Sequence, residues 1–141
     1  MYAPLVDNDE PLGLAPVVVF FSPQIRPFPS RKVIFSSIGA NLADIVGAVA
    51  VVPDLTNYPK GRIREQVEDA REALQWVNAN MHRFGGDPSR LFLSGMGIGG
   101  TVAQLVPLQA AIIESRDQFL AKNPGRTEED LPNGVREVKV Y

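Results

Sequence analysis

The chain has 141 residues, 45% of them hydrophobic, and its 14 Lys and Arg against 16 Asp and Glu leave a net charge of -2 at pH 7. This length suits one folded domain with its own core, and the absence of Cys excludes disulfides, thiolate zinc sites and cysteine nucleophiles. The balanced charge argues against nucleic-acid binding, and every apolar run falls short of the roughly 18 residues of a transmembrane segment. The first residues lack a basic start followed by an apolar stretch, so we expect no secretion signal and a cytoplasmic location.

The first third of the sequence predicts a strand, a helix and a second strand. Residues 1–16 show no period and are expected to form an irregular segment before a domain at 17–141. The continuous β-branched and aromatic run at 16–21 is typical of a strand buried on both faces of a parallel sheet, and residues 47–52 form a second such run. Between them, apolar residues recur every three or four positions and predict one helical face: Ile34, Ile38, Leu42 and Ile45.

A longer helix is predicted at 61–81, where apolar residues again recur every three or four positions. His82, the single histidine, follows this helix and is expected at the surface. Four large aromatic residues are expected in the core rather than around a cofactor, because of their strand and helical placement: Phe20, Phe21, Trp76 and Phe92.

The alternation of strand and helix continues after a turn. Residues 84–88 read Phe-Gly-Gly-Asp-Pro, which predicts that turn, with Asp87 placed to pair with Arg90. Residues 90–94 predict a third strand, and the glycine cluster at 95–100 opens another helix.

The end of the sequence completes the predicted architecture. Residues 122–134 are polar and predict a loop, and residues 135–141 alternate like a last strand. Strands alternating with helices predict an α/β protein with three αβα layers and a mostly parallel sheet. Sites in such sheets lie beyond the carboxyl ends of the strands, so the informative segments are 22–27, 54–61 and 95–100.

The glycine cluster, Gly-Met-Gly-Ile-Gly-Gly at 95–100, is compatible with two kinds of site. It satisfies the dinucleotide fingerprint G-x-G-x-x-G. That site also needs an acidic residue about 20 positions later, at the end of the next strand, whereas Glu114 and Asp117 fall inside a predicted helix. The alternative is a nucleophile elbow, G-x-S-x-G, in which a strained turn from strand to helix raises a nucleophile above the sheet.

The sequence around this cluster resembles the esterase and lipase branch of the α/β-hydrolase superfamily, most closely its prenylcysteine methylesterase-like and related fungal members. The matching features are Val-Val-Pro-Asp at 51–54, Asn-Tyr-Pro-Lys-Gly at 57–61, Ala-Leu-Gln-Trp-Val at 73–77 and Gly-Gly-Asp-Pro at 85–88. The last of these, at a fixed distance before the elbow, is the most specific. Because members of this branch are longer, the resemblance implies the N-terminal half of the domain, a partial α/β-hydrolase fold.

The resemblance also shows where this chain departs from the family. It places Gly95 and Gly99 on the flanks of the elbow and Gly97 at the position of the nucleophilic serine. Since Gly97 has no side chain, an acyl-enzyme cannot form there. Ser94 and Thr101 are near in sequence but are not expected to reach the position of the nucleophile.

The oxyanion hole and the remaining catalytic groups are altered as well. The family's His-Gly-Gly loop follows its first buried strand, where this chain has Ser22, Pro23 and Gln24. Pro23 has no N–H to donate to a developing negative charge, whereas Ile98, after the nucleophile position, keeps one and is the expected residual donor. The family's catalytic His and acid come beyond Tyr141, so no intact catalytic set is expected.

These observations predict one leading function and two alternatives. The leading one is a carboxylic-ester hydrolase (esterase or lipase) type of protein that is catalytically incompetent as this chain, a fragment or pseudoenzyme. Its candidate ligand is a small ester or apolar molecule, and no cofactor or metal is expected. The alternatives are a noncatalytic binding or interaction module that self-associates through the strand at 135–141, and nucleotide binding at the 95–100 turn.

Overall fold

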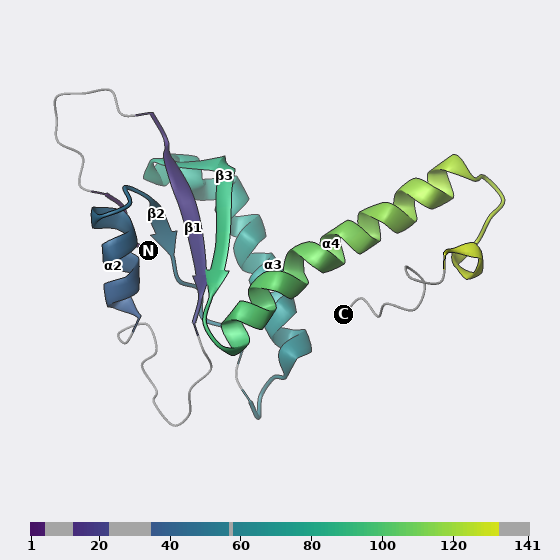
Figure 1. Ribbon diagram of the computed structural model, residues 1–141, viewed down its shortest axis with the longest axis horizontal. Coiled ribbons are helices and arrows are strands. Elements are labelled where there is room, and N and C mark those ends of the chain that lie inside the picture. The colour runs from purple at the N-terminus through teal and green to yellow at the C-terminus, as the bar shows by residue number, and fades with distance from the viewer. Residues whose placement is uncertain (5–12, 23–34, 57, 133–141) are drawn as a thin grey trace.

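The structure is a computed structural model that describes residues 1–4, 13–22, 35–56 and 58–132. Strands and helices alternate along the chain, as predicted (Figure 1). The predicted strand at 135–141 lies outside the described residues. The elements are β1 (Ala15–Phe21), α2 (Ser36–Asp44), β2 (Val49–Val51), α3 (Ile63–Asn80), the 3-10 helix η1 (Met81–Phe84), β3 (Gly86–Gly95), α4 (Ile98–Lys122) and the 3-10 helix η2 (Glu128–Asp130).

The described strands form one parallel sheet in the order β2-β1-β3. In the central strand, Val18 lies beside Ala50 of β2 on one side and beside Phe92 of β3 on the other. A central strand of a parallel sheet is covered on both faces, which explains the uninterrupted apolar run of β1. The parallel sheet and its helices confirm the predicted α/β class.

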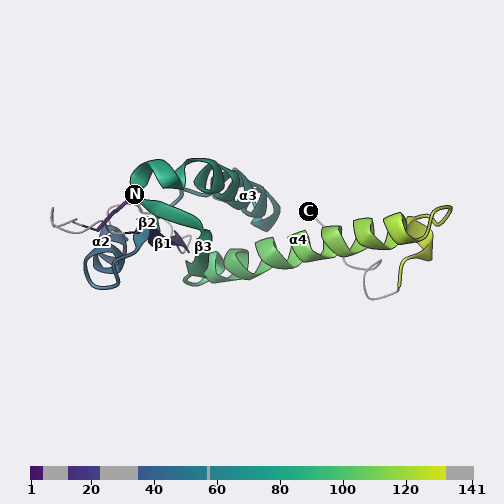
Figure 2. The ribbon, with the colours of Figure 1, turned by 90° about the horizontal axis from the view of Figure 1, so that it is seen from above.

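Helices cover the two faces of the sheet, with α2 and α3 on opposite sides (Figure 2). On one face, Val17, Val19 and Phe21 of β1 belong to a single core cluster with residues of α3 and α4. On the other face, α2 lies against β2, and the Phe20 and Phe35 ring centroids are 6.0 Å apart. The helical members of the core cluster are Val67, Ala70 and Val77 of α3 and Val102 and Val106 of α4.

β3 begins earlier than predicted, because the expected turn is built into the strand as a bulge. Pro16 of β1 pairs with Asp87, but the next residue, Val17, pairs with Leu91. Residues 88–90 are therefore skipped by the β1 ladder. Pro88 suits this place because proline has no N–H to donate to the ladder of hydrogen bonds between the strands.

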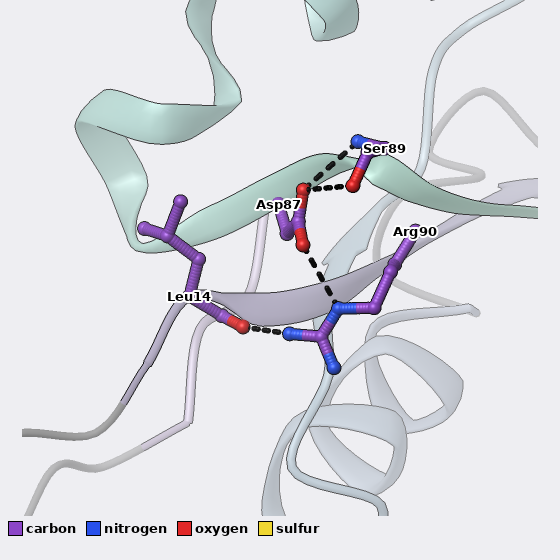
Figure 3. A network of polar contacts seen from close by, with 4 residues as sticks. All are labelled: Leu14, Asp87, Ser89 and Arg90. Carbon is purple, nitrogen blue, oxygen red and sulfur yellow. Dashed lines mark hydrogen bonds and ion pairs between the residues drawn. The ribbon is translucent and has the colours of Figure 1, made fainter.

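Asp87 organises the bulge (Figure 3). One carboxylate oxygen accepts the backbone N–H of Ser89 at 2.9 Å and its hydroxyl at 2.6 Å. The other accepts Nε of Arg90 at 2.9 Å, which confirms the predicted pairing of these two residues. Arg90 also donates to the carbonyl oxygen of Leu14, so the bulge is tied to the residue that precedes β1.

Two of the four aromatic residues predicted in the core are exposed, so that prediction is wrong for Trp76 and Phe92. The two phenylalanines at the end of β1 are buried as predicted. Trp76 is 48% exposed because it lies off the stripe of α3 that carries Val77, and its ring packs on Phe84 at a centroid distance of 6.0 Å. Phe92 is 58% exposed and lies on the α2 face of the sheet, in a strand that β1 separates from β2, on which α2 packs.

The first residues of the chain contact β2. Tyr2 and Ala50 exchange two backbone hydrogen bonds of 2.8 Å in an isolated antiparallel bridge. The Tyr2 ring also lies where a side chain at Gly39 of α2 would have to be. The segment expected to be irregular thus includes a contact that its sequence did not predict.

α4 is 25 residues long and extends well beyond the sheet (Figure 2). Its buried residues all lie in its first half, where it packs on the core. None of the described helices, α4 included, combines the length and the hydropathy that crossing a membrane would require. The buried residues of α4 are Gly99, Val102, Val106 and Gln109.

Candidate functional site

The glycine cluster lies at the carboxyl edge of the sheet, where the parallel strands end. It connects the last residue of β3, Gly95, to the first residue of α4, Ile98. The N–H of Met96 donates to the carbonyl oxygen of Phe21 at 3.2 Å, so the turn is bound to the end of the neighbouring strand. The turn therefore occupies the place where ligands bind in open α/β sheets.

Gly97 is the residue at the apex of this turn. Its backbone has φ 58° and ψ -127°, a conformation that L side chains rarely adopt. Its carbonyl oxygen accepts the N–H groups of Gly100 and Thr101 at 3.0 and 3.3 Å, so α4 starts immediately after it. A nucleophile elbow presents its nucleophile on a strained strand-to-helix turn of this kind, and Gly97, which has no side chain, stands at the apex of the turn.

The glycines on either side of Gly97 allow β3 and α4 to approach each other closely. A Cβ added to Gly95 would lie 2.5 Å from the carbonyl carbon of Gly99. A Cβ added to Gly99 would overlap the carbonyl of Phe21 in β1. Both positions thus require glycine for space, whereas Gly97 requires a particular backbone conformation.

The hydroxyls nearest in sequence lie on regular elements. Ser94 is within β3, where it pairs with Phe20, and Thr101 is within the first turn of α4. Neither occupies the apex of the turn, where Gly97 stands.

Of the residues compared with the family's oxyanion hole, Ile98 and Ser22 lie in the described part of the chain. Ile98 is the first residue of α4, and its N–H belongs to the first turn, where no helix carbonyl is available to accept it. Ser22 directly follows β1 and is 4% exposed. Pro23 and Gln24 lie outside the described residues.

His82 lies far from this turn. It is exposed, as predicted, and belongs to η1, which directly precedes β3. The glycine cluster follows the other end of β3, so the strand separates the histidine from Gly97. In the described ranges, no group of three His, Asp or Glu could hold a metal ion.

β2, like β3, ends at the carboxyl edge of the sheet. The loop that follows β2 is hydrogen-bonded to α3. The N–H of Thr56 donates to Oδ2 of Asp69 at 2.5 Å. Gln66 is 4% exposed, and its Oε1 has no hydrogen-bond partner within the described part of the chain. Sequence analysis did not single out Asp69 or Gln66, because a helical pattern identifies the apolar stripe and not the polar residues at its border.

The first turn of α3 is fixed by Glu65. Its carboxylate accepts the N–H of Arg62 at 2.7 Å, and this hydrogen bond holds the pKa of Glu65 below its ordinary value. The interaction orients the start of α3 at the same edge of the sheet as the glycine cluster.

A profile of the alpha/beta hydrolase fold family matches residues 33–122, which include the glycine cluster. The chain belongs to this family. Among curated relatives, the α/β-hydrolase chain is similar to the probable isoprenylcysteine alpha-carbonyl methylesterase ICMEL2 of Arabidopsis thaliana, with 35% identity over 109 residues, 77% of this chain and 25% of that protein. It is also similar to esterase LipC of Mycobacterium tuberculosis, with 29% identity over 73% of this chain and 25% of that protein.

Solved structures of esterases also resemble this chain. An esterase of Pyrobaculum calidifontis superposes with a TM-score of 0.59 and 27% identity, over 76% of this chain and 33% of that chain. A Pseudomonas putida esterase superposes with a TM-score of 0.59 and 29% identity, over 75% of this chain and 33% of that chain. The resemblance to the esterase branch is confirmed, and the chain spans 25% of the length of its first curated relatives.

Proposed function

We propose that this chain is an esterase-type α/β-hydrolase that binds a small ester or apolar ligand and does not hydrolyse it. The observation that carries the proposal is Gly97 at the apex of the elbow, where the backbone has the strained conformation and no nucleophilic atom is present. Serine-type ester hydrolysis needs an oxygen that attacks the carbonyl carbon and a base that takes its proton. Gly97 supplies no such oxygen, and His82 lies at the other end of β3.

The residues beside Gly97 suit a ligand with an apolar part. Met96 is 48% exposed and Ile98 is 39% exposed, so apolar side chains flank the apex of the turn. The N–H of Ile98 is a donor for the carbonyl oxygen of an ester. In this proposal, the turn retains part of the binding function of an esterase site after loss of the nucleophile.

Hydrolysis of a short p-nitrophenyl ester tests the catalytic half of the proposal. We expect no release of p-nitrophenol above the buffer background from the wild-type chain. The variant Gly97→Ser restores a hydroxyl but not a base, so it is also expected to remain inactive. Turnover by the wild type would overturn the proposal, and strong turnover by Gly97→Ser would show that a base is present after all.

Methyl NMR tests the binding half, because the chain has three methionines in distinct environments. Met96 adjoins Gly97, Met81 is fully buried in the core, and Met1 is 51% exposed at the start of the chain. A short-chain ester is expected to shift the methyl signal of Met96 in a saturable way and to leave those of Met1 and Met81 unchanged. No shift at Met96, or equal shifts at all three, would contradict binding at the turn.

A noncatalytic interaction module is the alternative from a different class. The observation that favours it is the outer edge of β3, which no described strand covers. Self-association through residues 135–141 would then make light scattering report a mass that rises with concentration.

Nucleotide binding is the weaker alternative, since Glu114 and Asp117 lie within α4 and not at the end of a strand. A cytoplasmic location remains part of the proposal, and cell fractionation tests it.

A further inference from the structure

The amino edge of the sheet, where the strands begin, carries exposed apolar side chains that the proposed function does not use. This edge lies at the opposite end of the strands from the turn between β3 and α4 (Figure 1). Leu14 directly precedes β1, and Phe84 precedes β3. Ile45 and Val46 lie in the connection from α2 to β2, and Ile45 is 79% exposed. Single apolar residues are normal on a protein surface, whereas several at one edge indicate a surface that binds a partner.

The strand order makes these residues neighbours. β1 lies between β2 and β3, so the start of β1 lies between the starts of the other two strands. The N–H of Ala15 donates to the carbonyl oxygen of Gly85 at 2.7 Å, and Figure 3 shows Leu14 beside the turn that leads into β3. The ring of Trp76 packs on that of Phe84 and continues the apolar surface towards α3. We call these five exposed residues the amino-edge row: Ile45, Val46, Leu14, Phe84 and Trp76.

Opposite charges flank the two ends of the amino-edge row. Asp44 ends α2 beside one end of the row, and Arg83 lies in η1 beside the other. Both are exposed, and neither forms an ion pair with another residue that the structure describes. Arg90, which also lies near this edge, is already paired with Asp87, and the exposed His82 lies on the same side as Arg83. The row therefore has a negative end and a positive end.

A row of this kind is complementary to a second copy of itself. A two-fold axis in the plane of the contact, midway between Asp44 and Arg83 and perpendicular to the line between them, exchanges their positions. Asp44 of each copy then meets Arg83 of the other, and the apolar side chains of the two rows lie against each other. We propose that the chain forms a two-fold dimer through the amino-edge row.

In this dimer the apolar row supplies the attraction, and the two charge pairs set the orientation. Five partly exposed side chains cover less area than the interface of a permanent dimer. The dissociation constant is therefore expected to be on the order of 10 μM, so the chain is monomeric in dilute solution. The glycine cluster stays accessible in the dimer, because it lies at the opposite edge of the sheet.

Charge reversal followed by sedimentation equilibrium tests the proposal. Asp44→Arg and Arg83→Asp each place two like-charged pairs in the dimer, so each is expected to raise the dissociation constant about 10-fold or more. An equal mixture of the two variants is expected to regain association of wild-type strength, because both charge pairs of the mixed dimer join opposite charges. Asp117→Arg, at an exposed position of α4 away from the amino edge, is the matched control and should associate like the wild type.

The fluorescence of Trp76, the single tryptophan, follows the dimer in the unaltered chain. Dilution through the dissociation constant is expected to shift its emission to longer wavelength and to increase quenching by acrylamide, since the half-exposed ring is covered only in the dimer. A wild-type chain that stays monomeric far above the expected constant would overturn the proposal. So would a dimer that both charge reversals leave intact, which would assign association to another surface, or a mixture of the two variants that stays monomeric.

Discussion

Gly99 of α4 lies against the carbonyl of Phe21 in β1, with no room between them for a Cβ. This contact brings the start of α4 directly over the end of the central strand. The same contact forces the chain between β3 and α4 into a very short turn, and Gly97 takes up the resulting positive φ. The position of the candidate site is therefore set by the packing of Gly99 on Phe21 and of Gly95 on Gly99.

Replacing Gly99 by alanine is expected to destabilise the fold by at least about 2 kcal/mol, because the added methyl group overlaps backbone atoms that cannot move independently. Urea denaturation followed by circular dichroism measures the change. Gly13→Ala is the matched control, since an added Cβ there meets nothing within 4 Å, and its effect should be much smaller. Equal stability of the two variants would contradict the close approach described for Gly99.

The sharp turn between β3 and α4 was predictable because its geometry depends on local sequence. Three glycines at alternate positions between a strand and a helix define both the turn and the place of Gly97. The position of His82 relative to this turn could not be predicted in the same way, from local sequence alone. His82 was expected at the surface from its place after α3, but its separation from the elbow depends on how β3 runs between them.

Gly97→Ser is expected to lower the free energy of unfolding by about 1–3 kcal/mol, because serine must adopt the positive φ that glycine tolerates. A serine introduced at an exposed α4 position, Ala110→Ser, serves as the control and should cost roughly 0.5 kcal/mol. The comparison separates the cost of the backbone conformation from the cost of a serine hydroxyl. A Gly97→Ser variant as stable as the wild type would mean that the turn relaxes to a negative φ.

The exposure of Phe92 and Trp76 could not be predicted from the sequence. Periodicity shows that a residue belongs to a strand or a helix, but not whether another element covers its face. Phe92 lies in an edge strand of the described sheet and Trp76 lies beside the core stripe of α3, so each is apolar without being enclosed. Both depend on the arrangement of elements distant in sequence.

The contact between α3 and α4 is expected to depend on Gln109. Its Oε1 accepts a hydrogen bond of 2.7 Å from Arg71, and its side chain is 2% exposed. Gln109→Ala should lower the free energy of unfolding by about 1–2 kcal/mol, because a partly buried hydrogen bond to a charged group is lost. The control is Gln118→Ala, which removes an exposed hydrogen bond within α4 and should change stability by less than about 0.5 kcal/mol.

The bulge in β3 is expected to make stability depend on pH through Asp87. The hydroxyl and N–H of Ser89, followed by Arg90, hold the pKa of Asp87 below its ordinary value. A carboxyl group whose pKa is lower in the folded state contributes stability that is complete above its unfolded pKa, about 3.9, and is lost as the pH falls through the folded value. Asp87→Asn should therefore be less stable than the wild type at pH 7, and the difference should shrink below about pH 4.

Urea denaturation of both proteins at pH 7 and in steps from pH 5 to pH 2 measures this difference. Asp44→Asn is the matched control, because Asp44 is an exposed carboxylate at the end of α2, away from the bulge. Its stability difference from the wild type at pH 7 should be small and gives the effect of an Asp-to-Asn change at an exposed position. A difference for Asp87→Asn that does not vary with pH would show that the aspartate acts in the bulge through its shape and not through its charge.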